Sequence, residues 1–135
     1  MKVWNACLAL LAMLLFTACG SAPAADPSRT AVQVARVVDG DTLEIHINGK
    51  KEHVRLIGID TPETKKPNTP VMYYGKEASE YTQKRLEHKQ VELEWDVGQR
   101  DRYGRLLAYV WIGDELFNRT LVQQGYARIS TFPPT

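Results

Sequence analysis

Hydrophobic and polar residues alternate along much of the chain with the period of two that half-buried strands show. This pattern predicts a first strand over residues 32–38 and a second strand over residues 43–47. The dipeptide Asn48-Gly49 that follows favours a tight type I′ hairpin turn. A third strand is expected over residues 54–59, so that three strands joined by short turns form a meander.

The hydrophobic period changes between residues 71 and 88, where apolar side chains recur three to five positions apart, as on an amphipathic helix. Alternation returns in residues 91–95 and 106–112, which are expected to form a fourth and a fifth strand. A second helix is expected around residues 116–122, with Gly125 at its C-terminal end. Five short strands with two helices predict a mainly β fold with added α structure, a small closed barrel of the OB type.

The N-terminal segment has the pattern of an export signal, because Lys2 precedes an apolar run over residues 6–16 and small residues follow it. A membrane-spanning helix requires roughly 20 apolar residues, so this run is too short to be one. The ending "LFTAC" resembles a bacterial lipobox, which would make Cys19 the lipid-modified first residue of the mature chain. A plain secretion signal that is cut near residues 22–25 is the alternative.

Three segments are therefore expected along the chain. They are a lipoprotein signal peptide over residues 1–18, a flexible tether rich in Ser, Ala and Pro over 19–29, and one folded domain over 30–135. The lipobox predicts an exported protein that is anchored in a membrane of the cell envelope through its N-terminal lipid. The alternative cleavage predicts a secreted, extracellular protein.

The charge balance excludes one class of nucleic-acid-binding protein. The chain has 17 Lys and Arg against 16 Asp and Glu, and removal of Lys2 with the signal would leave 16 of each. Proteins that coat nucleic acid through their overall field are markedly basic, so a polyanion would have to be held here by a local cluster of cations. Cys7 lies in the signal and Cys19 would carry lipid, which leaves no disulfide framework.

Arg55 is a candidate functional residue because it stands between Val54 and Leu56 in a strand of mostly apolar neighbours. A buried guanidinium is costly unless it is paired. Its partner could be a carboxylate of the protein or a phosphate gripped by both of its amino groups. The sequence leaves both possibilities open.

Acidic residues gather at the predicted strand ends, with Asp41 after the first strand and Asp60 and Glu63 after the third. Carboxylate and carbonyl oxygens are the ligands that a hard cation such as Ca²⁺ prefers. The alternative is that these segments are ordinary turns, in which Asp is common. That alternative explains each Asp singly, but it leaves the nearby Arg55 and Glu63 unexplained.

The stretch "DRYGRLLAY" adds a second arginine, Arg105, at the start of the fifth strand. Tyr103, just before Gly104, could stack on a base or a sugar, or could be a solvated turn residue. Arg102 belongs to the same charged turn, which is a useful position beside a polyanion.

Five segments occur in one order that resembles a known family: "VVDGDTLEI", "VRLIGIDTPET", "YGKEAS", "RDRYGRLLAYV" and "NRTLVQQGYA". Together they strongly resemble the staphylococcal nuclease, or thermonuclease, family over residues 32–129. The family fold is an OB-type barrel of five strands with helices, which agrees with the pattern of hydrophobic positions.

The resemblance implies a Ca²⁺-dependent phosphodiesterase that acts on DNA and RNA and leaves 3′-phosphate ends. By motif position, Asp41 and Asp60 would bind Ca²⁺ through their carboxylates, and Thr61 would bind it through its backbone carbonyl. Glu63 would act as the general base, or as the residue that orients the attacking water. Arg55 and Arg105 would grip the scissile phosphate and stabilise the charge that builds on it.

Further contacts with the nucleic acid are expected from four residues: Arg102, Tyr103, Lys65 and Phe132. Single-stranded or denatured nucleic acid is the preferred substrate, and the protein is expected to act as a monomer. Family members usually continue into a further helix, whereas this sequence ends at Thr135, so we expect a barrel without that helix that either has low stability or folds with the help of a ligand. Competing hypotheses are a catalytically weak or inactive module that binds nucleic acid or protein, and a structural lipoprotein domain.

Overall fold

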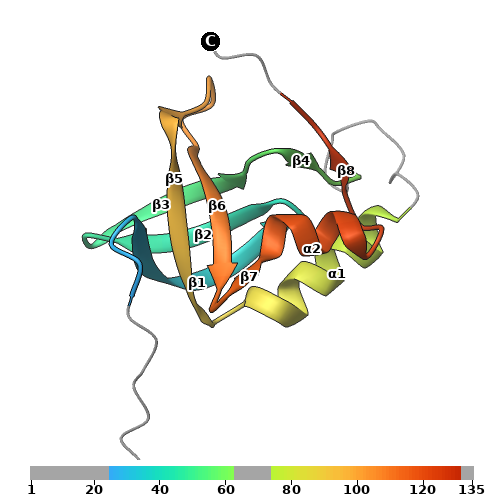
Figure 1. Ribbon diagram of the computed structural model, residues 1–135, viewed down its shortest axis with the longest axis horizontal. Coiled ribbons are helices and arrows are strands. Elements are labelled where there is room, and N and C mark those ends of the chain that lie inside the picture. The colour runs from blue at the N-terminus through green and yellow to red at the C-terminus, as the bar shows by residue number, and fades with distance from the viewer. Residues whose placement is uncertain (1–24, 63–73, 132–135) are drawn as a thin grey trace, which may run out of the picture.

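The computed structural model describes residues 25–62 and 74–131, and five strands in it close a barrel (Figure 1). These strands are β1 (Arg29–Asp39), β2 (Thr42–Ile47), β3 (Lys50–Leu56), β5 (Gln90–Arg100) and β6 (Leu106–Ile112). The sheet order is β3-β2-β1-β5-β6 with antiparallel neighbours, and a parallel pairing of β3 with β6 closes the barrel. The predicted fold class, a mainly β barrel of five strands with two helices, is confirmed.

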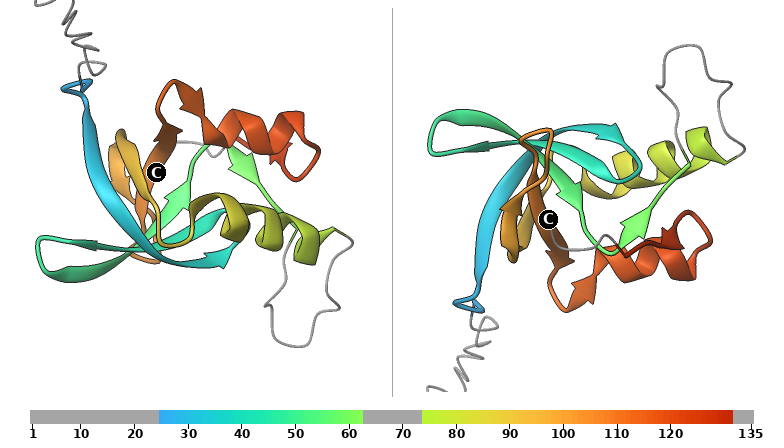
Figure 2. Two further views of the ribbon diagram at one scale, coloured as in Figure 1. Left: turned by 90° about the horizontal axis from the view of Figure 1, so that it is seen from below. Right: turned by 90° about the horizontal axis from the view of Figure 1, so that it is seen from above.

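Shorter elements surround the barrel. Helix α1 (Gly75–Leu86) contacts β1, and helix α2 (Phe117–Gln123) contacts β6. Strand β7 (Glu115–Leu116) extends the sheet beyond β6, and β4 (Ile59–Asp60) pairs with β8 (Arg128–Ile129) in a separate two-stranded sheet. Both helices and the β4–β8 pair lie at the same end of the molecule, away from the tip of the β2–β3 hairpin (Figures 1 and 2). Within the described ranges, no helix is long and apolar enough to cross a membrane.

A core of aliphatic side chains fills the barrel, and Phe117 and Leu121 of α2 join it from outside the sheet. Burial of such side chains stabilises the fold by about 1.5–3 kcal/mol each. The fully buried strand residues of this core are Val34, Leu43, Ile45, Val54, Leu56, Leu93, Ala108 and Val110.

The β2–β3 turn has the geometry that its sequence predicts. Asn48 and Gly49 have φ angles of 52° and 73°, so both central residues have the positive φ that a type I′ turn requires. Ile47 and Lys50 close the loop as paired residues. The predicted end of the second helix is confirmed as well, because Gly125 follows it at a φ of 80°.

Strand boundaries differ most from the prediction in the third and fourth strands, and β1 also begins earlier than expected, at Arg29. The expected third strand over residues 54–59 is wrong at both ends, because β3 begins at Lys50 and a break at Ile57 and Gly58 separates it from β4. Gly58 has a φ of 75°, which no regular strand adopts. The fourth strand continues to Arg100 instead of ending at residue 95, and residues 97–100 of this extension are exposed.

Candidate active site

Two carboxylates share one buried arginine beside the start of β4. The Nη2 atom of Arg55 lies 3.2 Å from Oδ2 of Asp41 and 3.3 Å from Oδ1 of Asp60. The side chains of Arg55, Asp41 and Asp60 are 9%, 10% and 33% exposed. The structure therefore brings together three of the residues that the sequence singled out, from the β1–β2 turn, β3 and β4.

The sheet register explains why these residues meet. Arg55 on β3 pairs with Thr42 on β2, directly after Asp41 in the chain. Val54 and Leu56 face the core on either side of Arg55, so alternation turns the guanidinium to the other face of the strand. The expectation that Arg55 must have a partner is confirmed, and the partners are the carboxylates of the site itself.

A close contact between two backbone segments fixes Asp41. The amide of Thr61 donates to Oδ2 of Asp41 at 3.0 Å, and the Thr42 hydroxyl donates to its Oδ1, also at 3.0 Å. A Cβ atom added to Gly40 would lie 2.9 Å from the Thr61 hydroxyl, so the turn requires glycine for this approach. The carboxylate is therefore held by hydrogen bonds before any ligand arrives.

Asn118 on α2 positions β4, and sequence reasoning missed it. Its Oδ1 accepts from the amide of Val110 at 2.9 Å, and its Nδ2 donates to the carbonyl of Ile57 at 2.9 Å. Asn118 is buried, so these bonds link α2 and β6 to the segment that leads to Asp60. A single buried Asn in a helix carries no sequence signal for such a role, because its partners are distant in the chain.

Arg105 lies directly before β6, the strand that pairs with the strand of Arg55. Leu106 and Leu107 pair with Val54 and Arg55 in the parallel β3–β6 ladder, and Arg105 immediately precedes them. Its Nε lies 2.7 Å from Oδ2 of Asp101, and its side chain is 31% exposed. The guanidinium is thus oriented by a carboxylate and remains accessible to a ligand.

The β5–β6 turn that carries Arg105 is braced by Asp101. Burial acts to raise the pKa of the Asp101 carboxyl, but hydrogen bonds from the side chain and backbone of Arg105 outweigh burial and hold the pKa below its ordinary value. Tyr103 in this turn is 68% exposed, and the guanidinium carbons of Arg102 and Arg105 lie 4.8 Å and 5.3 Å from the centre of its ring. One exposed aromatic ring with two arginines suits stacking on a base next to a phosphate.

A third arginine, which the sequence did not single out, reaches the site from β8. The Nη2 atom of Arg128 lies 2.9 Å from Oδ2 of Asp60, and its Nε lies 3.3 Å from the same oxygen. The two residues pair across the short β4–β8 ladder. No local pattern could have shown this, because two two-residue strands that are 68 positions apart make the contact.

The oxygen atoms of this site fit a hard cation. Asp41 and Asp60 provide carboxylate oxygens, and the buried hydroxyl of Thr61 has no hydrogen-bond partner among the described residues. Within the same part of the chain, no three His, Cys, Asp or Glu side chains form a cluster, and the described residues offer two carboxylates with hydroxyl and carbonyl oxygens. Such mixed oxygen sets are typical of Ca²⁺ sites.

Four predicted residues lie outside the described ranges, so the structure does not test their roles: Cys19, Glu63, Lys65 and Phe132.

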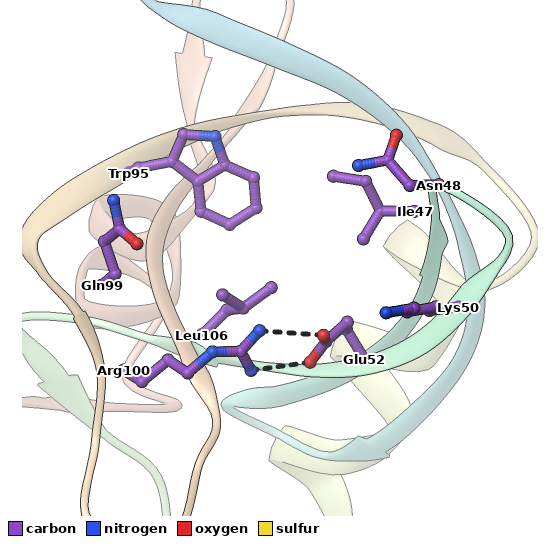
Figure 3. Close-up of a pocket in the computed structure, with 8 residues that line it drawn as sticks. All are labelled: Ile47, Asn48, Lys50, Glu52, Trp95, Gln99, Arg100 and Leu106. Atoms are coloured by element: carbon purple, nitrogen blue, oxygen red, sulfur yellow. Dashed lines mark hydrogen bonds and ion pairs between the residues drawn. The ribbon is translucent and has the colours of Figure 1, made fainter.

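A separate cavity of about 420 Å³ lies at the far end of the β2–β3 ladder (Figure 3). Trp95, Ile47 and Leu106 point into it, and Arg100 and Glu52 form a double ion pair across one side, at 2.8 Å and 2.9 Å. Thr42 and Arg55 form one end of this ladder, whereas Ile47 and Lys50 form the other. The cavity is therefore distinct from the site of Asp41, Arg55 and Asp60.

Comparison with known proteins agrees with this geometry. Residues 53–135 match the family described as Staphylococcal nuclease homologue. The chain is 57% identical over 101 residues to the thermonuclease of Staphylococcus intermedius, covering 75% of this chain and 60% of that protein. It is 49% identical over 114 residues to the thermonuclease of Staphylococcus hyicus, covering 84% of this chain and 68% of that protein.

A more distant relative is the endonuclease YncB of Bacillus subtilis, 45% identical over 100 residues, covering 73% of this chain and 47% of that protein. The matched region thus spans less than the full length of each of these relatives. The family model covers more than half of the chain, and the chain therefore belongs to the staphylococcal nuclease family.

Proposed function

We propose that this protein is a Ca²⁺-dependent nuclease that hydrolyses phosphodiester bonds of DNA and RNA and leaves 3′-phosphate ends. The observation that carries the proposal is the buried guanidinium of Arg55, held between Asp41 and Asp60 on β3, which pairs with the strand that begins directly after Arg105. Relatives named thermonuclease and endonuclease support it.

Asp41, Asp60 and the backbone carbonyl of Thr61 are the proposed Ca²⁺ ligands. When bound, the cation would neutralise and orient a phosphate and polarise it for attack. The hydrogen bonds from Thr61 and Thr42 keep the Asp41 carboxylate oriented. A ligand that is held in place in this way loses little conformational entropy when it binds a cation.

The two arginines have different proposed roles because their surroundings differ. Arg55 is locked between two carboxylates, so it presents a fixed positive charge to the scissile phosphate. Arg105 is more exposed and is held by Asp101, from which it can turn its amino groups to a phosphate. One donor aimed at developing charge is worth about 2.7–4 kcal/mol in the oxyanion hole of an acyl-transfer enzyme, which sets the scale for each arginine.

Glu63 is the proposed general base, or the residue that orients the attacking water, and it lies three positions after Asp60 in the chain. Arg102, Tyr103, Lys65 and Phe132 are proposed to bind the flanking nucleic acid, with single-stranded or denatured strands preferred. A single strand exposes its bases for stacking, which a ring such as Tyr103 can use.

The N-terminal sequence supports a proposed location. A lipid on Cys19 would anchor the protein in a membrane of the cell envelope and leave the barrel outside the cytoplasm as a monomer. Cleavage near residues 22–25 would release it instead. Substitution of Cys19 by Ser, followed by fractionation of membranes, distinguishes the two, since only a lipid-anchored protein would leave the membrane fraction.

The nuclease proposal is tested with purified protein and denatured DNA, in millimolar Ca²⁺ or in a chelator, by following the ultraviolet absorbance of released nucleotides. Glu63→Gln should abolish most of a rise that requires Ca²⁺. Glu80→Gln is the matched control, because Glu80 is exposed on α1. If the folded wild-type protein shows no rise but binds DNA in the chelator, it is a binding module.

A further inference from the structure

Asp60 shares its two oxygens between two arginines of different character. Oδ1 faces Nη2 of Arg55 at 3.3 Å, whereas Oδ2 faces Nη2 and Nε of Arg128 at 2.9 Å and 3.3 Å. Arg55 is also held by Asp41, and its side chain is 9% exposed. Arg128 is 79% exposed and lies at the edge of the two-stranded β4–β8 sheet.

This difference decides which arginine can be displaced. Arg55 is fixed on two sides, by the buried Asp41 and by the partly exposed Asp60, and removing it would leave the buried charge of Asp41 without its ion pair. An exposed ion pair such as Arg128–Asp60 contributes little to stability, because water screens it. Arg128 can therefore leave Asp60 at low cost when a stronger partner for either residue is present.

We propose that Arg128 competes with the divalent cation for Asp60 and, once released, binds a phosphate of the nucleic acid. This inference rests on the proposed function, in which Asp60 is a cation ligand. A cation that needs Oδ2 must displace the guanidinium, so Arg128 weakens cation binding in the free protein. A nucleic-acid phosphate attracts Arg128 in a bidentate pair and removes the competitor.

Two opposite effects of one substitution follow. Arg128→Gln should tighten the binding of Ca²⁺ to the nucleic-acid-free protein about three- to tenfold, as measured by calorimetry. The same variant should bind a fluorescent single-stranded oligonucleotide more weakly in a chelator, where no turnover occurs. Loss of one phosphate contact lowers the slope of log affinity against log salt by about 0.7 for a single strand.

Two further variants distinguish the competition of Arg128 for Asp60 from the general effect of removing a positive charge. Arg119→Gln removes the same charge from the exposed face of α2, and among the described residues Arg119 belongs to no ion pair of the site. It should change the Ca²⁺ affinity less than twofold. Arg128→Lys keeps the charge without the forked geometry and should lie between the wild type and Arg128→Gln.

The full chain, purified in detergent, is used for every arm, and circular dichroism checks that each variant is folded. If Asp60→Asn removes Ca²⁺ binding while Arg128→Gln binds Ca²⁺ like the wild type, the competition is wrong and the cation site stands. If the wild type itself binds no Ca²⁺, both the cation site and the competition are wrong. Unchanged oligonucleotide affinity and salt slope in Arg128→Gln would overturn the phosphate contact.

Discussion

The hydroxyl of Thr82 donates a hydrogen bond to the carbonyl oxygen of Gly40 at 2.8 Å. Thr82 is fully buried on the inner face of helix α1, and Gly40 is the residue before Asp41 in the β1–β2 turn. The helix is therefore bonded directly to the turn that carries a proposed cation ligand. Helix α1 supports the site as well as covering β1.

Thr82→Val should destabilise the protein while keeping nearly the same shape. Valine fills the same volume but leaves the buried carbonyl of Gly40 without its donor, which costs about 1–3 kcal/mol. Urea unfolding measures the loss, and Thr82→Ser is the control because it retains a hydroxyl. If valine and serine variants unfold at the same urea concentration, the hydrogen bond is not the source of the effect.

Gly40→Ala should impair the site through a steric contact. The added Cβ would lie 2.9–3.0 Å from side-chain atoms of Thr61, so one of the two segments must move. We expect a stability loss of about 1–3 kcal/mol, typical of overpacking, together with weaker Ca²⁺ binding. Gly98→Ala on β5 is the control, since its Cβ would meet nothing within 4 Å. Equal Ca²⁺ affinities in the two variants would contradict this prediction.

The barrel strands could be predicted from the sequence because the signals for a strand and for a tight turn are local in the chain. Alternation and the Asn48-Gly49 turn indicate the β2–β3 hairpin, and both are local properties. The outer part of β5 could not be predicted, because its exposed residues up to Arg100 carry no alternating hydrophobic period. The break at Gly58 was missed for a related reason, since Ile57 and Ile59 still look like a continuous strand.

The residues of the candidate site also fall into two groups, those that the sequence could predict and those that it could not. Three residues could be singled out because each is a charged residue inside or at the end of an apolar strand: Asp41, Arg55 and Asp60. Arg128 and Asn118 could not, because they reach the site only through pairing of β4 with β8 and packing of α2 on β6.

Arg55→Gln and Arg105→Gln should have similar effects on the rate of hydrolysis but different effects on the free energy of unfolding. Both should lower the rate about 10²–10³-fold, because each removes a cation from the proposed phosphate site. Arg55→Gln should also destabilise the Ca²⁺-free protein by about 3–5 kcal/mol, because the buried carboxylate of Asp41 then loses its ion pair and Asp60 keeps only the exposed Arg128. Arg105 is partly exposed, so its loss should cost less than about 1 kcal/mol.

Ca²⁺ provides the control for this pair of variants. It should restore part of the stability of Arg55→Gln, since it neutralises the two carboxylates, and it should leave the small deficit of Arg105→Gln unchanged. Thermal unfolding with and without Ca²⁺ measures both effects. Equal restoration in the two variants would show that the cation does not bind between Asp41 and Asp60.

Glu44 on β2 gives the protein a defined response to acid. Its buried carboxylate lies 2.9 Å from Nη2 of Arg36 and 3.1 Å from Nζ of Lys51. The hydrogen bond from Arg36 lowers its pKa, burial opposes that change, and Lys51 lowers it further, so that the pKa falls from 4.5 to about 2. Because the folded value is the lower one, the unfolded chain takes up the proton first as the pH falls.

The stabilisation from Glu44 should therefore be fully present above about pH 4.5 and should be lost as the pH falls toward about 2. Glu44→Gln removes the titrating group, so the difference in unfolding free energy between wild type and variant should be greatest near pH 7 and should shrink below pH 4. Urea unfolding at a series of pH values measures it, and Glu80→Gln, at an exposed position of α1, is the control. A difference that stays constant from pH 7 to pH 2 would show that Glu44 stabilises the fold through its shape and packing, because only an ionised carboxylate that loses its charge can give the expected decline.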